Sequence, residues 1–103
     1  MKDYKTKLKR DMLITLESVL EHALSEPVTD NSEFNKMYLA LLAEISGKVY
    51  RKLGEVKKEY SFSLTPAQAL AFRVFCLLKG GEVTSYSGNR MNQIANQINQ
   101  LYA

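Results

Sequence analysis

The side chains with the clearest chemistry lie near the end of the chain, where amides follow an arginine at helical spacing. Arg90, Asn92, Gln93, Asn96 and Gln97 form this group. Asn and Gln can make two hydrogen bonds to the edge of adenine, and Arg can pair with guanine or hold a phosphate. Recognition residues of this kind often occupy the first turns of a helix. We therefore expect these five residues to form a candidate nucleic-acid interface.

A family resemblance falls on the same segment. Residues 88–99 read Gly-Asn-Arg-Met-Asn-Gln-Ile-Ala-Asn-Gln-Ile-Asn, which resembles the Gly-Asn-Asn-Leu-Asn-Gln-Ile-Ala pattern of MobC-type mobilisation proteins. Those proteins are relaxosome accessory factors that bind plasmid DNA, so the resemblance implies a DNA-binding role. The rest of the chain does not predict the basic, strand-led N-terminal half expected of a ribbon-helix-helix DNA binder. The net charge of +3 is also low for such a protein.

A second candidate surface consists of small and amide side chains. Gly47 and Gly54 are seven residues apart, so on one helix they share a face, with Ala43 close to it. Small side chains let another backbone approach closely, and Asn99 and Gln100 add amides to a helix that carries no charge after Arg90. We expect Ala43, Gly47, Gly54, Asn99 and Gln100 to take part in self-association. The alternative is a helix that tolerates two glycines or is kinked at one of them.

Catalytic and metal chemistry are not predicted. The one histidine, His22, and the one cysteine, Cys76, are far apart in the sequence, and Cys76 lies in the most apolar segment. A free cysteine in such surroundings behaves as a small hydrophobe. Glu17 and Glu21 are one helical turn apart but lack the Glu-x-x-His pairs of a metal-binding bundle. We expect neither an enzyme nor a cofactor nor a metal site.

Four predicted helices position these groups, over residues 4–25, 33–60, 64–81 and 89–102. The third is apolar nearly all round, with Thr65 as N-cap, Pro66 at the first position and a left-handed Gly80 closing it, so we expect the other helices to cover it. The second is the longest, and its apolar spacing above 3.6 residues predicts a bend or a break near a glycine. Residues 61–64 form a short linker whose alternating apolar residues suit a few residues of extended chain, with Phe62 and Leu64 in the core. The irregular segment 80–88 is a long loop between the last two helices.

These features predict one all-α domain over residues 1–103, a small four-helix bundle with a central apolar third helix and a long second helix. The alternative is a three-helix core with the last helix packed across it or exchanged with a second copy. The single cysteine, the absence of a signal-peptide pattern and the absence of a long apolar stretch favour the cytoplasm. We expect a non-enzymatic interaction or accessory protein that forms a homodimer and binds a protein partner or a second copy of itself, with no membrane contact. The alternative function is nucleic-acid binding through the last helix.

Overall fold

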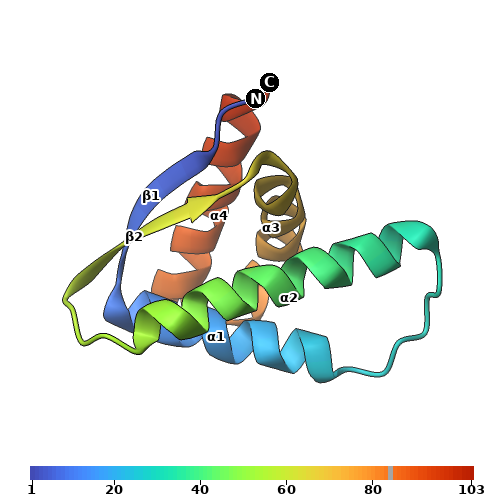
Figure 1. Ribbon diagram of the computed structural model, residues 1–103, viewed down its shortest axis with the longest axis horizontal. Helices are drawn as coiled ribbons and strands as arrows, with labels where there is room; N and C mark the ends of the chain where they lie inside the picture. The colour runs from blue at the N-terminus through green and yellow to red at the C-terminus, as the bar shows by residue number, and fades with distance from the viewer. Residues whose placement is uncertain (84) are drawn as a thin grey trace. The chain divides into compact units, whose positions relative to one another are not determined.

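The computed structural model describes residues 1–83 and 85–103. Within these residues the chain is mostly helical, with four α-helices as predicted and two strands that the sequence reading did not predict. The order of the elements is β1 (Tyr4–Lys9), α1 (Arg10–Ser25), α2 (Glu33–Leu53), β2 (Glu59–Leu64), α3 (Pro66–Lys79), a 3-10 turn η1 (Gly80–Glu82) and α4 (Ser85–Leu101) (Figure 1). A strand followed by two helices therefore occurs twice along the chain.

Strand β1 corrects the prediction that the first helix begins at residue 4. Tyr4 and Leu8 are buried while the lysines between and after them are exposed, which is the alternation of a half-buried strand. β1 pairs with β2 in a two-stranded antiparallel sheet. Next to this ladder, the backbone N–H of Arg10 donates to the carbonyl of Lys58 at 3.3 Å. Leu8 fits either a helical or a strand pattern, and pairing with a distant segment selects the strand.

The second helix ends at Leu53 and not near residue 60, so its predicted length is wrong. Gly54 is its C-cap, and the Gly54 N–H donates to the carbonyls of Arg51 and Lys52. The predicted break near a glycine is thus confirmed. The linker expected at 61–64 belongs to β2, and the burial predicted for Phe62 and Leu64 is confirmed.

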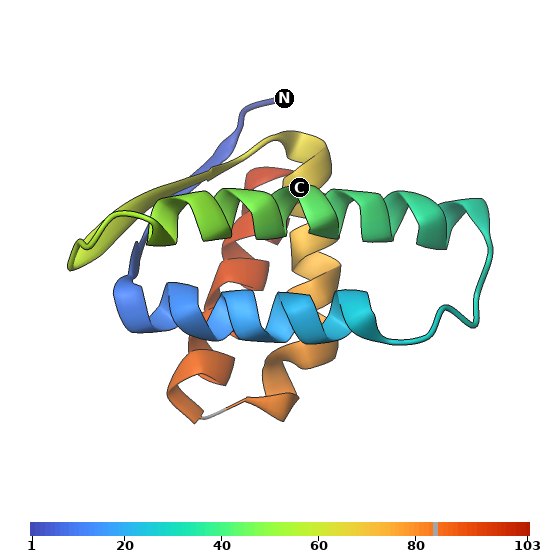
Figure 2. The ribbon, with the colours of Figure 1, turned by 60° about the horizontal axis from the view of Figure 1, so that its bottom comes forward.

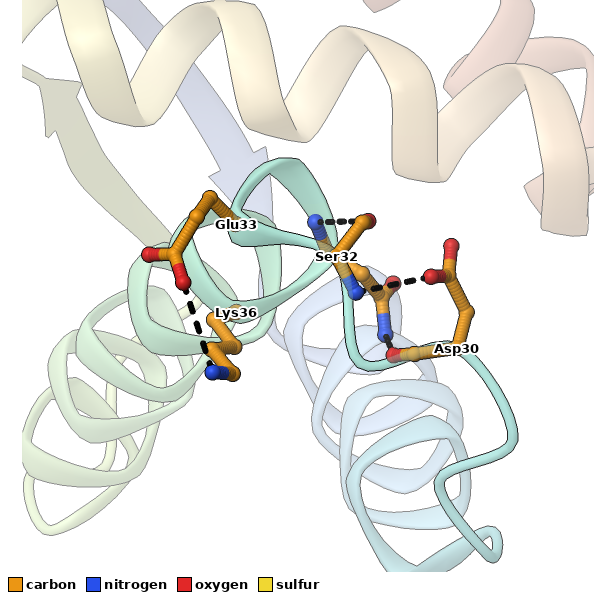
Figure 3. Close-up of polar contacts among 5 residues, drawn as sticks. Asp30, Ser32, Glu33 and Lys36 are labelled. Atoms are coloured by element: carbon orange, nitrogen blue, oxygen red, sulfur yellow. Dashed lines mark hydrogen bonds and ion pairs between the residues drawn. The ribbon is translucent and has the colours of Figure 1, made fainter.

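The start of α2 is fixed by local hydrogen bonds (Figure 3). Ser32 Oγ accepts from the backbone N–H of Asn35 at 3.2 Å, and the Ser32 N–H donates to Asp30 Oδ1 at 2.9 Å. The Asn35 side chain donates to the Asp30 carbonyl at 2.8 Å, and Lys36 pairs with Glu33 at 3.4 Å. The Ser32 contact satisfies one of the backbone donors that the first turn of a helix leaves without partners, and the other contacts hold the chain that leads into the helix.

Helix α3 has the predicted N-terminus. Thr65 and Gln68 form a reciprocal capping box, and Pro66 occupies the first turn. Gly80 is the C-cap, but its φ of −59° is right-handed, so the predicted left-handed closure is wrong. The chain instead continues into η1, and α4 already begins at Ser85, which makes the predicted loop over 80–88 too long. Thr84, which belongs to that predicted loop, lies outside the described residues.

The chain divides into two compact units. In the unit Lys7–Ser61, α1 and α2 lie side by side (Figure 2), and their facing sides bury Leu13, Leu16 and Leu20 of α1 and Leu42, Ile45 and Val49 of α2. In the unit formed by Met1–Thr6 and Phe62–Ala103, α3 packs against α4. There the ring centroid of Phe72 is 5.9 Å from that of Phe62 and 5.8 Å from that of Phe75.

The expectation that α3 is covered on all sides is wrong. Its buried face contains Phe72, Phe75 and Cys76. On the opposite face Leu70, Leu77 and Leu78 are 40%, 57% and 63% exposed. Helix α3 therefore has one apolar side in the core and a second apolar side in solvent.

Candidate nucleic-acid interface

The outer face of strand β1 is a row of lysines. Because side chains alternate along a strand, Lys5, Lys7 and Lys9 fall on the face opposite Tyr4 and Leu8, and all three lysines are exposed. Residues two apart in a strand are about 6.6–6.8 Å apart. The β1 face therefore presents ammonium groups at a regular short spacing.

Strand β2 adds hydroxyl groups to this surface. Its buried residues are Tyr60, Phe62 and Leu64, so Ser61 and Ser63 fall on the other face together with Glu59. We call the six residues Lys5, Lys7, Lys9, Glu59, Ser61 and Ser63 the outer ribbon face. It holds three cations, two hydroxyls and one carboxylate. Lysine can donate to the O6 and N7 acceptors of guanine and serine to several bases, and a two-stranded ribbon fits the major groove of DNA.

A compact hydrogen-bond network holds the loop that precedes β2, within the unit Lys7–Ser61. The buried hydroxyl of Tyr60 donates to the carbonyl of Glu55 at 2.6 Å and accepts from the backbone N–H of Lys57 at 3.0 Å. The Arg10 guanidinium donates to the same hydroxyl and, at 3.0 Å, to the Glu55 carbonyl. Lys57 and Lys58 project from this loop as exposed side chains, and Lys57 Nζ is 3.0 Å from a carboxylate oxygen of Glu55.

Three of the five residues predicted to bind nucleic acid lie on the side of α4 that faces β1. Arg90 donates to the Thr6 hydroxyl at 3.1 Å and to Gln93 Oε1 at 2.9 Å. Gln97 Oε1 accepts from the Tyr4 hydroxyl at 2.7 Å. Arg90 and Gln97 therefore join α4 to the first half of the strand, and Gln93 accepts a hydrogen bond from Arg90.

The other two predicted residues lie elsewhere on α4. Asn92 lies beside the C-cap of α3, because a Cβ atom placed on Gly80 would be 3.3 Å from Asn92 Oδ1. Asn96 is exposed, about 100° around the helix from Gln97. The five predicted residues therefore do not form one surface. Only the side of α4 that carries Arg90 faces β1.

An open groove of about 430 Å³ lies between the start of β1 and α4, lined by Asp3, Tyr4, Lys5, Thr6, Gln97 and Leu101. Burial raises the pKa of the Tyr4 hydroxyl above its ordinary value, although the hydrogen bond with Thr6 and the nearby Arg90 charge act in the opposite direction. Tyr4 therefore remains a neutral donor to Gln97 near neutral pH.

The residues predicted for self-association belong to different parts of the chain. Ala43 is exposed on α2, and Gly47 is half-buried, with its open Cβ position 3.7 Å from the Arg51 guanidinium. Gly54 is the cap of α2 and not part of a continuous helical face. Asn99 and Gln100 are exposed near the end of α4.

The titratable groups considered for catalysis are Cys76, His22 and Glu17. Cys76 is fully buried, and burial raises the pKa of its thiol far above the ordinary range, which removes nucleophilic character. The His22 side chain is 75% exposed and lies 3.7 Å from Glu26. Desolvation and the neighbouring Glu21 raise the pKa of Glu17.

Two further structural findings concern the part of the chain that is described. None of its clusters of His, Cys, Asp and Glu has the three members needed to hold a metal ion. None of its helices combines the length and apolar character needed to cross a bilayer.

The outer ribbon face was not predicted from the sequence, although its signal is present there. The segment Tyr4–Lys9 reads Tyr-Lys-Thr-Lys-Leu-Lys, which alternates apolar or small side chains with lysines. The segment Glu59–Leu64 alternates in the same way, with serine in place of lysine. Two such alternations together are typical of a hairpin-like sheet with one polar face.

Comparisons of this chain with protein-family models, with curated proteins and with solved structures found no match.

Proposed function

We propose that the protein binds duplex DNA through the outer ribbon face. The observation that carries the proposal is that every outward position of β1 is an exposed lysine, beside the serines of β2. Cations on this face complement the phosphate charge, and the hydroxyls and ammonium groups suit the donor and acceptor pattern of base edges.

Two features of the chain support DNA over other anionic partners. The basic N-terminal strand expected of a ribbon-helix-helix DNA binder, which the sequence reading did not predict, is present as β1. The segment that resembles MobC-type mobilisation proteins lies within α4, whose Arg90 contacts Thr6 of that strand. The resembling segment therefore contacts the first half of the basic strand.

The charges on the ribbon set the expected salt dependence. Neutralising three phosphates gives a slope of log K against log salt of about −2.7, which is roughly a 40-fold loss of affinity between about 50 and 200 mM salt. Removing one contacting lysine should reduce the size of the slope by about 1.

The test is fluorescence anisotropy of a labelled mixed-sequence duplex across that salt range, with Lys5→Gln and Lys9→Gln. Lys36→Gln is the matched control, because Lys36 is an exposed lysine on α2 that pairs with Glu33. We expect both strand variants to bind more weakly with a shallower slope and the control to match the wild type. Binding that is absent at low salt, or reduced equally by all three variants, would overturn the proposal.

A second candidate function, self-association, is favoured by the outward apolar face of α3. Together, the exposed parts of Leu70, Leu77 and Leu78 correspond to the surface of about one and a half fully exposed leucines. At about 1.5–3 kcal/mol for each buried leucine, two copies packed through this face gain about 5–10 kcal/mol. Association costs about 4–15 kcal/mol, so the proposed homodimer is weak and forms only at high concentration. We propose that the protein is cytoplasmic. We also propose that its partner at this face is a second copy of itself.

A further inference from the structure

We propose that the loop over residues 54–58 is a second DNA-contacting element and that Tyr60 is the residue that positions it. This inference rests on the proposed function, because it adds phosphate contacts beside the outer ribbon face. It assigns to Tyr60 a role that depends on its hydroxyl and not on its ring.

The contacts of Tyr60 explain why its hydroxyl controls the loop. The hydroxyl joins the Glu55 carbonyl to the Lys57 N–H, two backbone groups on either side of Val56. Arg10, the first residue of α1, contacts both the hydroxyl and the Glu55 carbonyl. Because Tyr60 is buried on the inward face of β2, this bridge ties the loop to the buried side of that strand.

The loop fixed in this way is basic and lies at one end of the ribbon. Lys57 and Lys58 are exposed, and the hydrogen bond from Arg10 N–H to the Lys58 carbonyl places Lys58 directly beside the end of β1. Lys9, the last residue of β1, is also exposed. Glu55 pairs with Lys57 through its carboxylate, while its carbonyl is the group that Tyr60 holds.

DNA is a better occupant than an acidic protein surface because the lysines of β1 are followed by Lys57 and Lys58 of the loop, with only the carboxylates of Glu55 and Glu59 among them. These lysines follow the strand and then the loop, which suits a backbone that carries a charge at every nucleotide. An acidic protein would instead need carboxylates at matching positions. The experiment includes this alternative as an outcome.

The experiment measures the salt slope of duplex binding for Tyr60→Phe, which changes no charge. Tyr50→Phe is the matched control, because Tyr50 is 70% exposed on α2. If the fixed loop adds two phosphate contacts, Tyr60→Phe should lower the size of the slope by about 1–2, while Tyr50→Phe leaves it unchanged. A merely structural role would lower the melting temperature without changing the slope at a temperature where both variants are folded.

A double-mutant comparison completes the test. The double variant Lys57→Gln/Lys58→Gln should reduce the size of the salt slope by about 2. Adding Tyr60→Phe to it should cause little further change, because both perturbations remove the same phosphate contacts. An unchanged slope in Tyr60→Phe, or fully additive losses, would overturn the positioning role. If the Tyr60 test fails but the strand variants Lys5→Gln and Lys9→Gln still weaken binding, the proposed DNA binding by the outer ribbon face stands. Tighter binding of a poly-glutamate probe than of DNA would overturn this inference in favour of an acidic protein partner.

Discussion

Gly88 provides the sharpest test of the packing between α3 and α4. It is buried in the first turns of α4, and a Cβ atom added there would overlap the carbonyl oxygen of Gly80. That oxygen belongs to the backbone at the C-cap of α3, so it cannot move aside as a flexible side chain can. We therefore expect Gly88→Ala to force the end of α3 away from α4.

The magnitude follows from two opposing effects. Alanine in place of glycine in a helix gains up to about 1 kcal/mol from propensity. Forcing an extra methyl group into a well-packed site costs about 1–3 kcal/mol. Gly47→Ala is the matched control, because its nearest neighbour would be the mobile Arg51 guanidinium at 3.7 Å. Gly47→Ala should gain stability, so Gly88→Ala should be less stable than Gly47→Ala by about 1–3 kcal/mol.

The assay is urea denaturation at 25 °C followed by far-ultraviolet circular dichroism, supported by thermal melts. For a domain of this size, each 1 kcal/mol corresponds to about 4–8 °C in melting temperature. A Gly88→Ala variant at least as stable as Gly47→Ala would refute the close approach of α4 to Gly80. A loss of stability in Gly47→Ala would instead refute the open environment assigned to that glycine.

Two further predictions concern the buried tyrosine and the exposed leucines. Because burial raises the pKa of Tyr4 above 10.0, the stability that it contributes is complete below pH 10 and is lost as pH rises through the higher folded value. Urea titrations at several alkaline pH values should therefore show a steeper loss for wild type than for Tyr4→Phe, and parallel curves would contradict this. Leu77→Glu should abolish concentration-dependent dimerisation in light scattering, whereas Ile14→Glu, at a similar 50% exposure on α1, should not. A wild-type protein that stays monomeric at about 1 mM, or a Leu77→Glu variant that dimerises normally, would exclude the α3 face.

Local interactions are what the sequence by itself determined. The capping box at Thr65 depends on Gln68, three residues away, and the Ser32 cap depends on the backbone N–H of Asn35, also three residues away. The burial of Phe62 likewise follows from residue type and short-range alternation, whereas the end of α2 at Gly54 was predicted only as a bend or break near a glycine. These features could be predicted because the residues that interact to form them are close in the sequence.

Only the tertiary structure decided the sheet and the surface that it presents. β1 and β2 come together across segments separated by about 50 residues, as the contact between Arg10 and Tyr60 shows. Without that pairing, Leu8 fits a helical stripe as well as a strand, and the lysines of β1 do not form a face. The same holds for Arg90 and Gln97, whose places next to Thr6 and Tyr4 depend on how α4 packs. Long-range pairing and packing depend on the free energy of the whole fold, which no single stretch of the sequence determines.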